Sequence, residues 1–172
     1  MSTIFSKRDI SDSLKAKAIK LGLCDQWQAE WGNPTKDDLC EKFIRGLDFC
    51  IEHDFPNLRL MKRHFDGVMQ NHGIFVDECE ICLCNQGTVV ANGRTTGQAY
   101  YDEFSVGQVY VRHQSAIRIV ARGNAVVNVR CYDTPKVEVV CKDSARVTVI
   151  RHDQGRLSTS GNVKVINRNH KN

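Results

Sequence analysis

The sequence lacks any apolar run that approaches the roughly 20 residues needed to cross a bilayer. Its opening stretch, MSTIFSKRDISDSLKAK, also lacks an apolar segment of signal-peptide length. These two absences predict no membrane association. We expect a protein that stays in the cytoplasm of the cell that makes it, or that is packaged into a virion from there.

Motifs for catalysis and for cofactor binding are missing as well. The stretch TVVANGRTTG contains glycines but neither G-x-x-x-x-G-K-[ST] nor G-x-G-x-x-G. His113 and His152 have no evident nucleophile beside them. Asp133, Asp143 and Asp153 form a row, but each stands in a turn, where Asp is favoured because it bonds to nearby backbone. The sequence therefore predicts no enzyme and no cofactor.

A second C-x-x-C pair is also missing. The segment CEICLC holds the candidate metal ligands Cys79, Cys82 and Cys84, but a structural zinc site requires a further pair. If this segment is a strand with Ile81 and Leu83 inward, Cys79 points inward as well. The other two cysteines then point outward and cannot easily share a metal with it, so we expect none. The 8 cysteines of the chain are interpreted as reduced thiols in the core.

What the sequence does contain is a soluble globular composition with an uneven charge. Hydrophobic residues make up 41% and charged residues 26%. Residues 1–103 hold 12 Lys+Arg and 16 Asp+Glu, a net charge of −4, whereas residues 104–172 hold 12 and 4, a net charge of +8. This shift predicts two regions of different organisation.

Residues 1–73 are predicted to be helical. Gly22 is a plausible stop for the first helix. The stretch TKDDLCEKFIRGLDFCIEHDF indicates one helix opened by Thr35 or Lys36, with apolar residues three and four apart. Pro56 suits the first turn of a further helix, PNLRLMKRHFDGVM.

The remainder of the chain, residues 74–172, carries a ten-residue repeat. Small residues recur at one position, and apolar residues recur two, four and six residues later. The small position holds Ser105, Ser115, Ala125, Pro135, Ala145 and Gly155, and the first apolar position holds Gly107, Ile117, Val127, Val137, Val147 and Leu157. Alternation of apolar and polar residues indicates half-buried strands, and the segments RGNA, YDTP, KDSA and HDQG indicate turns.

Such a repeat predicts a β-solenoid, in which two ten-residue sides make a flattened coil of 20 residues. An antiparallel meander also uses short strands and tight turns, but these turns lack the Asn-Gly and Asp-Gly pairs of two-residue hairpins. The predicted fold class is α+β, with a helical region over residues 1–73 and a β-solenoid over residues 74–172. Because a solenoid end leaves backbone groups unpaired, we expect the helical region to cap the first coil.

Four segments of the chain carry a resemblance to a group of known proteins. They are LGLCDQWQAEW, KFIRGLDFCIEHDFP, HGIFVDE and VYVRHQSAIRIVARGNAVVNVRCYD, in this order. With them the chain resembles, over most of its length, a group of proteins from gut bacteria and their phages. The resemblance implies the helical-plus-solenoid layout. It implies no activity, because the group has no assigned function.

The outward positions of the repeat are rich in basic residues. They carry Arg112, Arg118, Arg122, Arg130, Lys136, Lys142, Arg146 and Arg156. Stacked strands lie roughly 4.8 Å apart, so like charges on one face repel unless something neutralises them. One interpretation is a solubilising surface, and the other is a docking face. The candidate binding residues are Arg112, Arg118, Arg122, Arg130, Tyr132, Lys142 and Arg146.

These observations predict a non-enzymatic binding or assembly protein, carried by a phage or a mobile element. It is expected to dock a protein partner, or a second copy of itself, through the solenoid. Self-association would join the acidic helices of one copy to the basic coils of another, head to tail. The alternative is a nucleic-acid-binding protein that uses the basic face of the solenoid.

Overall fold

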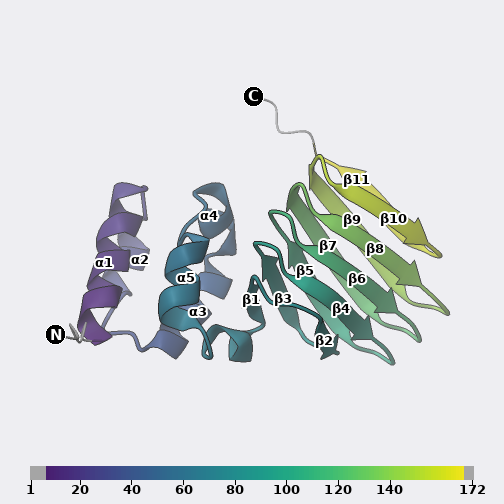
Figure 1. Ribbon diagram of the computed structural model, residues 1–172, viewed down its shortest axis with the longest axis horizontal. Coiled ribbons are helices and arrows are strands. Elements are labelled where there is room, and N and C mark those ends of the chain that lie inside the picture. The colour runs from purple at the N-terminus through teal and green to yellow at the C-terminus, as the bar shows by residue number, and fades with distance from the viewer. Residues whose placement is uncertain (1–6, 169–172) are drawn as a thin grey trace. The chain divides into compact units, whose positions relative to one another are not determined.

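The computed structural model describes residues 7–168 and shows a mixed α+β protein. The chain folds into two compact units that divide between His72 and Gly73. The first unit is helical and the second is a β-solenoid, as predicted (Figure 1). Over the described residues, no helix combines the length and the apolar content that crossing a membrane would require.

Among the residues that the structure describes, five α-helices and a 3-10 helix make up the first unit. Their bounds are α1 Lys7–Lys20, α2 Asp25–Ala29, α3 Lys36–Arg45, α4 Leu47–Glu52, α5 Leu58–Phe65 and η1 Met69–His72. Buried apolar side chains line their facing sides, among them Leu14, Phe43, Met61 and Met69. Trp31 is also buried, and its indole Nε1 donates a hydrogen bond to Ser11 Oγ at 3.0 Å.

Two helix predictions in this unit need correction. The single long helix is divided into α3 and α4, because Gly46 adopts a non-helical conformation between them. Its predicted start is confirmed, since Thr35 and Asp38 form a reciprocal capping box at the N-terminus of α3. Pro56 does not lie in a helix: it follows a cis peptide bond, and Asn57 behind it caps α5.

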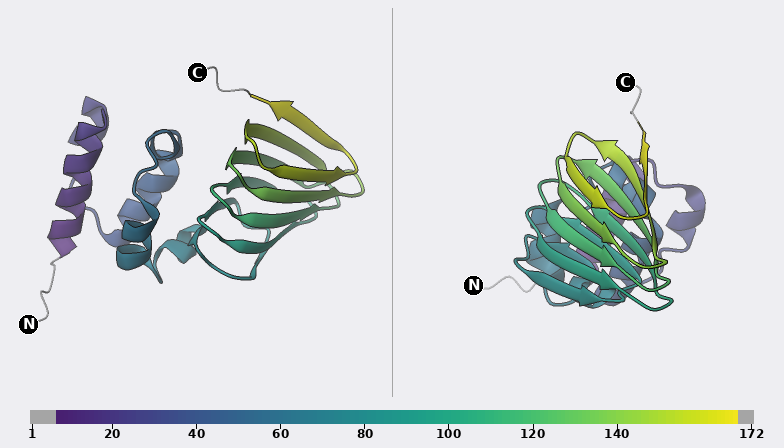
Figure 2. Two further views of the ribbon diagram at one scale, coloured as in Figure 1. Left: turned by 45° about the horizontal axis from the view of Figure 1, so that its top comes forward. Right: turned by 90° about the vertical axis from the view of Figure 1, so that its right-hand side faces the viewer.

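Within the described part of the chain, eleven strands make up the second unit. Their bounds are β1 Ile74–Val76, β2 Ile81–Cys84, β3 Thr88–Asn92, β4 Thr96–Tyr101, β5 Val106–Val111, β6 Ala116–Ala121, β7 Val126–Asp133, β8 Lys136–Cys141, β9 Arg146–Asp153, β10 Arg156–Ser160 and β11 Val163–Asn167. Successive strands alternate between two parallel sheets, so the chain winds as a flattened coil (Figure 2). We call β1-β3-β5-β7-β9-β11 sheet A and β2-β4-β6-β8-β10 sheet B. Parallel pairing excludes the antiparallel meander.

The register confirms a 20-residue coil in the middle of the solenoid. Val106 pairs with Val126, and Ala116 pairs with Lys136. The first and last steps are shorter: Ile81 pairs with Gly97, and Val147 pairs with Val163, a spacing of 16 residues in each case. The first and last coils are therefore shorter than the middle ones by four residues.

The core is a column of inward side chains shared by both sheets. Val127, Val129, Val139 and Val149 are at most 1% exposed. They lie beside Cys131 and Cys141, which are buried as apolar fillers, as expected. The small position of the repeat lies at a tight corner, because a Cβ atom added to Gly155 would stand 2.2 Å from the carbonyl oxygen of Pro135.

The turn residues bind the neighbouring coil. His113 and Asp133 both have positive φ, 57° and 71°. Asp133 Oδ2 accepts a hydrogen bond from the backbone N–H of His113 at 3.0 Å, and Asp143 Oδ2 accepts one from that of Gly123 at 3.0 Å. The structure thus gives these two aspartates the backbone-bonding role that their turn positions predicted.

Candidate docking faces of the solenoid

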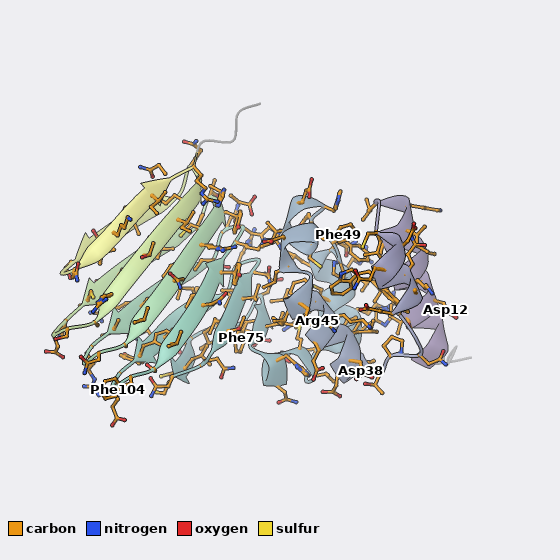
Figure 3. All side chains as sticks on the ribbon, turned by 180° about the vertical axis from the view of Figure 1, so that it is seen from behind. Asp12, Asp38, Arg45, Phe49, Phe75 and Phe104 are labelled. Atoms are coloured by element: carbon orange, nitrogen blue, oxygen red, sulfur yellow. The ribbon has the colours of Figure 1, made fainter. Side chains whose placement is uncertain are left out.

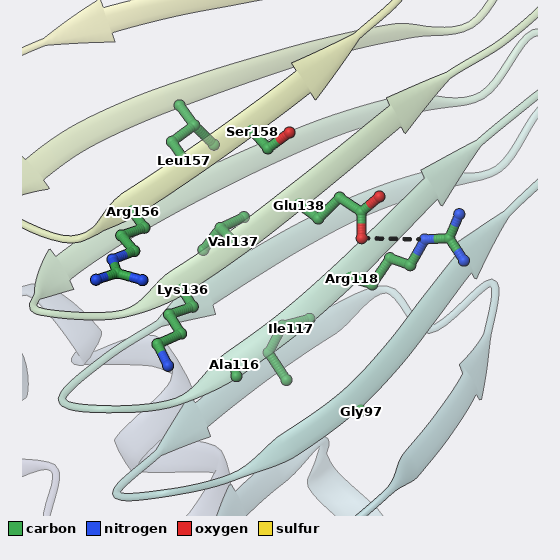
Figure 4. A pocket seen from close by; sticks show the side chains of 10 residues that line it. All are labelled: Gly97, Ala116, Ile117, Arg118, Lys136, Val137, Glu138, Arg156, Leu157 and Ser158. Atoms are coloured by element: carbon green, nitrogen blue, oxygen red, sulfur yellow. Dashed lines mark ion pairs between the residues drawn. The ribbon is translucent and has the colours of Figure 1, made fainter.

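Sheet B presents a largely basic outer face in its later coils. The register places Lys136 directly beside Arg156, and Arg118 directly beside Glu138 (Figure 4). Lys136, Arg156 and the turn residue Lys142 are exposed. None of these three forms an ion pair with any other side chain that the structure describes.

Two other cations on this face are matched by carboxylates. Arg118 Nε lies 3.4 Å from Glu138 Oε2, and Arg122 Nη2 lies 3.0 Å from Asp102 Oδ2. Hydrogen bonds from Asn85 and from Arg122 hold the pKa of Asp102 below its usual value. Because these pairs are largely exposed, each adds little stability. Their effect is to leave Lys136 and Arg156 as the unmatched pair of the face.

Two shallow hollows lie on this face. The first, of about 400 Å³, has the cations Lys136 and Arg156 at its margin and Ile117, Val137 and Leu157 among its apolar lining. The second, of about 430 Å³, is lined by Tyr100, Val120, Arg122 and Lys142. Arg118 lines both hollows, which are therefore neighbours.

Sheet A carries a different outer face. The guanidinium of Arg130 lies over the ring of Tyr110, 5.6 Å from its centroid. One coil on, Tyr132 stacks on His152 with ring centroids 4.7 Å apart and an angle of 5° between the planes. Arg112, predicted to be an outward binding residue, is only 5% exposed and donates from Nη1 to Asn92 Oδ1 at 3.3 Å. The prediction that Arg112 lies on an accessible face was therefore wrong.

The predicted binding residues do not form one site. The 20-residue coil sends successive ten-residue repeats to opposite sheets, so the set divides. Sheet B and its turns carry Arg118, Arg122 and Lys142, whereas sheet A and its turns carry Arg112, Arg130, Tyr132 and Arg146. The outer face of sheet B also contains Lys136 and Arg156, which the alternation placed outward but which were left out of the predicted set.

An exposed apolar group lies at the N-terminal ends of the inner strands β5 and β7 of sheet A. Phe104 is 82% exposed and projects from the turn before β5 (Figure 3). Val106 and Val126, which pair directly, are 62% and 40% exposed. This group has no titratable side chain of its own.

The cysteine predictions are corrected in part. Cys79 is exposed and lies before β2, because Glu80 at a φ of 56° interrupts the strand alternation. Cys82 and Cys84 are exposed on the outer face of sheet B, as expected. None of the eight cysteines, all of which the structure describes, forms a disulfide, and Cys40, Cys50, Cys131 and Cys141 are the four that are buried. Within residues 7–168, no three His, Cys, Asp or Glu side chains are grouped as metal ligands.

These features define a β-solenoid repeat protein with an N-terminal helical unit. No family model, no curated protein and no solved structure matches the chain.

Proposed function

We propose that the protein is a non-enzymatic docking protein whose solenoid binds an acidic protein surface through the outer face of sheet B. The observation that carries this proposal is the adjacent pair Lys136 and Arg156, which no carboxylate of the described residues neutralises. Like charges directly opposite on neighbouring strands destabilise a sheet. A partner that supplies carboxylates at the hollow relieves this repulsion.

The composition of the face favours a protein over a nucleic acid. Glu138 and Asp102 stand among the cations and would repel phosphates. Half-buried Val120 and Val140 lie between the charged rows. A mixture of apolar centre and charged rim is typical of protein interfaces. The resemblance to proteins of gut bacteria and their phages supports an origin in a phage or mobile element.

Nucleic acid is the second candidate partner. Tyr100 is 36% exposed and lines the same hollow as Arg118, Arg122 and Lys142. Proteins that bind single-stranded nucleic acid use an aromatic ring beside several cations, because the ring stacks on a base and the cations contact the phosphates.

Binding of labelled polyglutamate, followed by fluorescence anisotropy, tests the proposal. The double variant Lys136→Glu/Arg156→Glu should lose at least roughly tenfold in affinity, because it replaces attraction with like-charge repulsion. The control Arg146→Glu/Lys164→Glu, on the exposed side of sheet A, makes the same charge change and should leave the affinity nearly unchanged.

Equal losses in both variants would show that only total charge matters, and would reject sheet B as the docking face. A single-stranded oligonucleotide is titrated in parallel. Tighter binding of the oligonucleotide than of polyglutamate, lost in the sheet B variant, would favour the nucleic-acid candidate.

A further inference from the structure

The excess of acidic over basic residues lies in the first coils of the solenoid, not in the helices. Residues 1–72 contain 11 Lys+Arg and 11 Asp+Glu, so the helical unit has no net charge. Residues 73–103 contain Arg94 against five acids and carry −4, whereas residues 104–172 carry +8. The charge therefore changes sign along the axis of the solenoid. Because the helical unit has no net charge, the head-to-tail contact expected between the helices of one copy and the basic coils of another has no electrostatic basis.

This gradient is visible within a single row of sheet B. The residue before β2 is Glu80, and its backbone N–H donates to Thr96 Oγ1 at 3.1 Å. Thr96 pairs with Ala116, which pairs with Lys136, which pairs with Arg156. The row thus runs from an acid through a small central residue to two bases.

If a second copy presents the same row in the opposite order, the acid at one end of each row lies opposite a base at the other end. We infer that the outer face of sheet B docks against the same face of a second copy, with the two solenoids antiparallel. The two-fold axis then lies along β6, so that Ala116 meets Ala116 of the other copy. Glu80 meets Arg156 and Thr96 meets Lys136. This inference rests on the proposed docking function of the face and names its occupant.

The other rows agree with the same axis. Reversal places Tyr100 opposite Val140, and Val120 opposite its own copy, which makes an apolar centre. In the row that follows the C-terminal ends of the strands, Asp102 of one copy faces Lys142 of the other. Lys142 has no ion pair with the rest of the described chain. Arg118 faces its own copy, and the Glu138 that pairs with each Arg118 at 3.4 Å within its own chain reduces the repulsion between the two guanidinium groups.

The arrangement closes instead of growing. An interface that uses the same patch on both copies is isologous and gives a dimer, whereas the head-to-tail contact expected from the sequence risks open filaments. Two sheet faces pack about 10 Å apart with interdigitating side chains. The small side chain of Ala116 and the hollow beside it allow this approach at the axis.

Charge reversal with rescue tests the register. Glu80→Arg and Arg156→Glu should each weaken the dimer at least roughly tenfold, because each places like charges together at two symmetry-related points. The double variant Glu80→Arg/Arg156→Glu should restore it. Within one chain these residues are four strands apart, about 19 Å, so the rescue cannot come from a contact inside one copy.

Sedimentation equilibrium across protein and salt concentrations measures the dimer, with Arg146→Glu on sheet A as the control. A second measurement uses the exposed native thiols. Reversal places Cys82 opposite Ser158, so Ser158→Cys should give a covalent dimer with a short bis-maleimide cross-linker, because such a reagent spans sheet faces about 10 Å apart, whereas Thr148→Cys on sheet A should not.

Each outcome decides between the two proposals. A wild-type protein that stays monomeric yet binds polyglutamate through Lys136 and Arg156 would overturn the second-copy inference and support the docking face. A dimer that the double charge reversal does not restore would overturn the antiparallel register. A protein that stays monomeric and also fails to bind polyglutamate would overturn both proposals.

Discussion

Gly107 shows at the residue scale how one position departs from its own repeat. The repeat places apolar side chains here, such as Ile117 and Val127, and β5 has glycine instead. A Cβ atom at Gly107 would stand 2.3 Å from the ring of Tyr101, which is 1% exposed. The Tyr101 hydroxyl donates to the carbonyl oxygen of Gln86 at 2.9 Å. Burial raises the pKa of Tyr101 to about 12. The ring therefore replaces the missing side chain of Gly107.

Restoring the repeat at this position should destabilise the protein. Gly107→Ala is expected to cost about 1–3 kcal/mol of unfolding free energy, because it overpacks the core against a held ring. Denaturant midpoints of the variant and the wild type measure this loss. In a Tyr101→Leu background the same substitution should cost much less. An equal cost in both backgrounds would show that the ring is not the obstacle.

At the element scale, each strand separates an inward from an outward side chain at every step. Val137 is 4% exposed, whereas the neighbouring side chain of Glu138 is 52% exposed. The alternation therefore holds in β8, and it holds in the other middle strands. It fails before β2, where the left-handed residue Glu80 reverses the expected direction of Cys79.

Val137→Asp should unfold the solenoid, because it places an unpaired charge in the inner column at a cost of several kcal/mol. Glu138→Gln should change the unfolding free energy by less than about 1 kcal/mol, because the ion pair that it removes, between Glu138 and Arg118, is exposed. Thermal unfolding followed by circular dichroism compares the two. Similar melting temperatures for both variants would contradict the inward placement.

On the scale of the whole molecule, the helical unit stays a predicted cap for the first coil. A solenoid fragment of residues 73–172 should aggregate, because its first strands would offer free edges to other chains. Size-exclusion chromatography with light scattering separates this outcome from the proposed dimerisation, which reversing the charge of Glu80 or of Arg156 should weaken. A soluble fragment with the dimerisation of the full chain would show that the helices are not needed as a cap.

The sequence alone determined the coil and its inner column. A strand of alternating residues and a turn of Asp, Gly or Pro are local features, and both repeat every ten residues from Ser105 to Gly155. The helical region was equally readable, apart from the break at Gly46 and the position of Pro56. These two depend on backbone conformations that periodicity does not report.

Only the tertiary structure decided which residues are neighbours. Side chains ten residues apart lie on opposite sheets, and those 20 apart lie side by side, so the predicted basic column divided between two faces. The shortened 16-residue first step then brought Glu80 beside Thr96 and into the row of Lys136 and Arg156. The repeat period is a property of the sequence along the chain. A row of charges is formed by residues from neighbouring strands, so it depends on the length of each coil and on the register between strands.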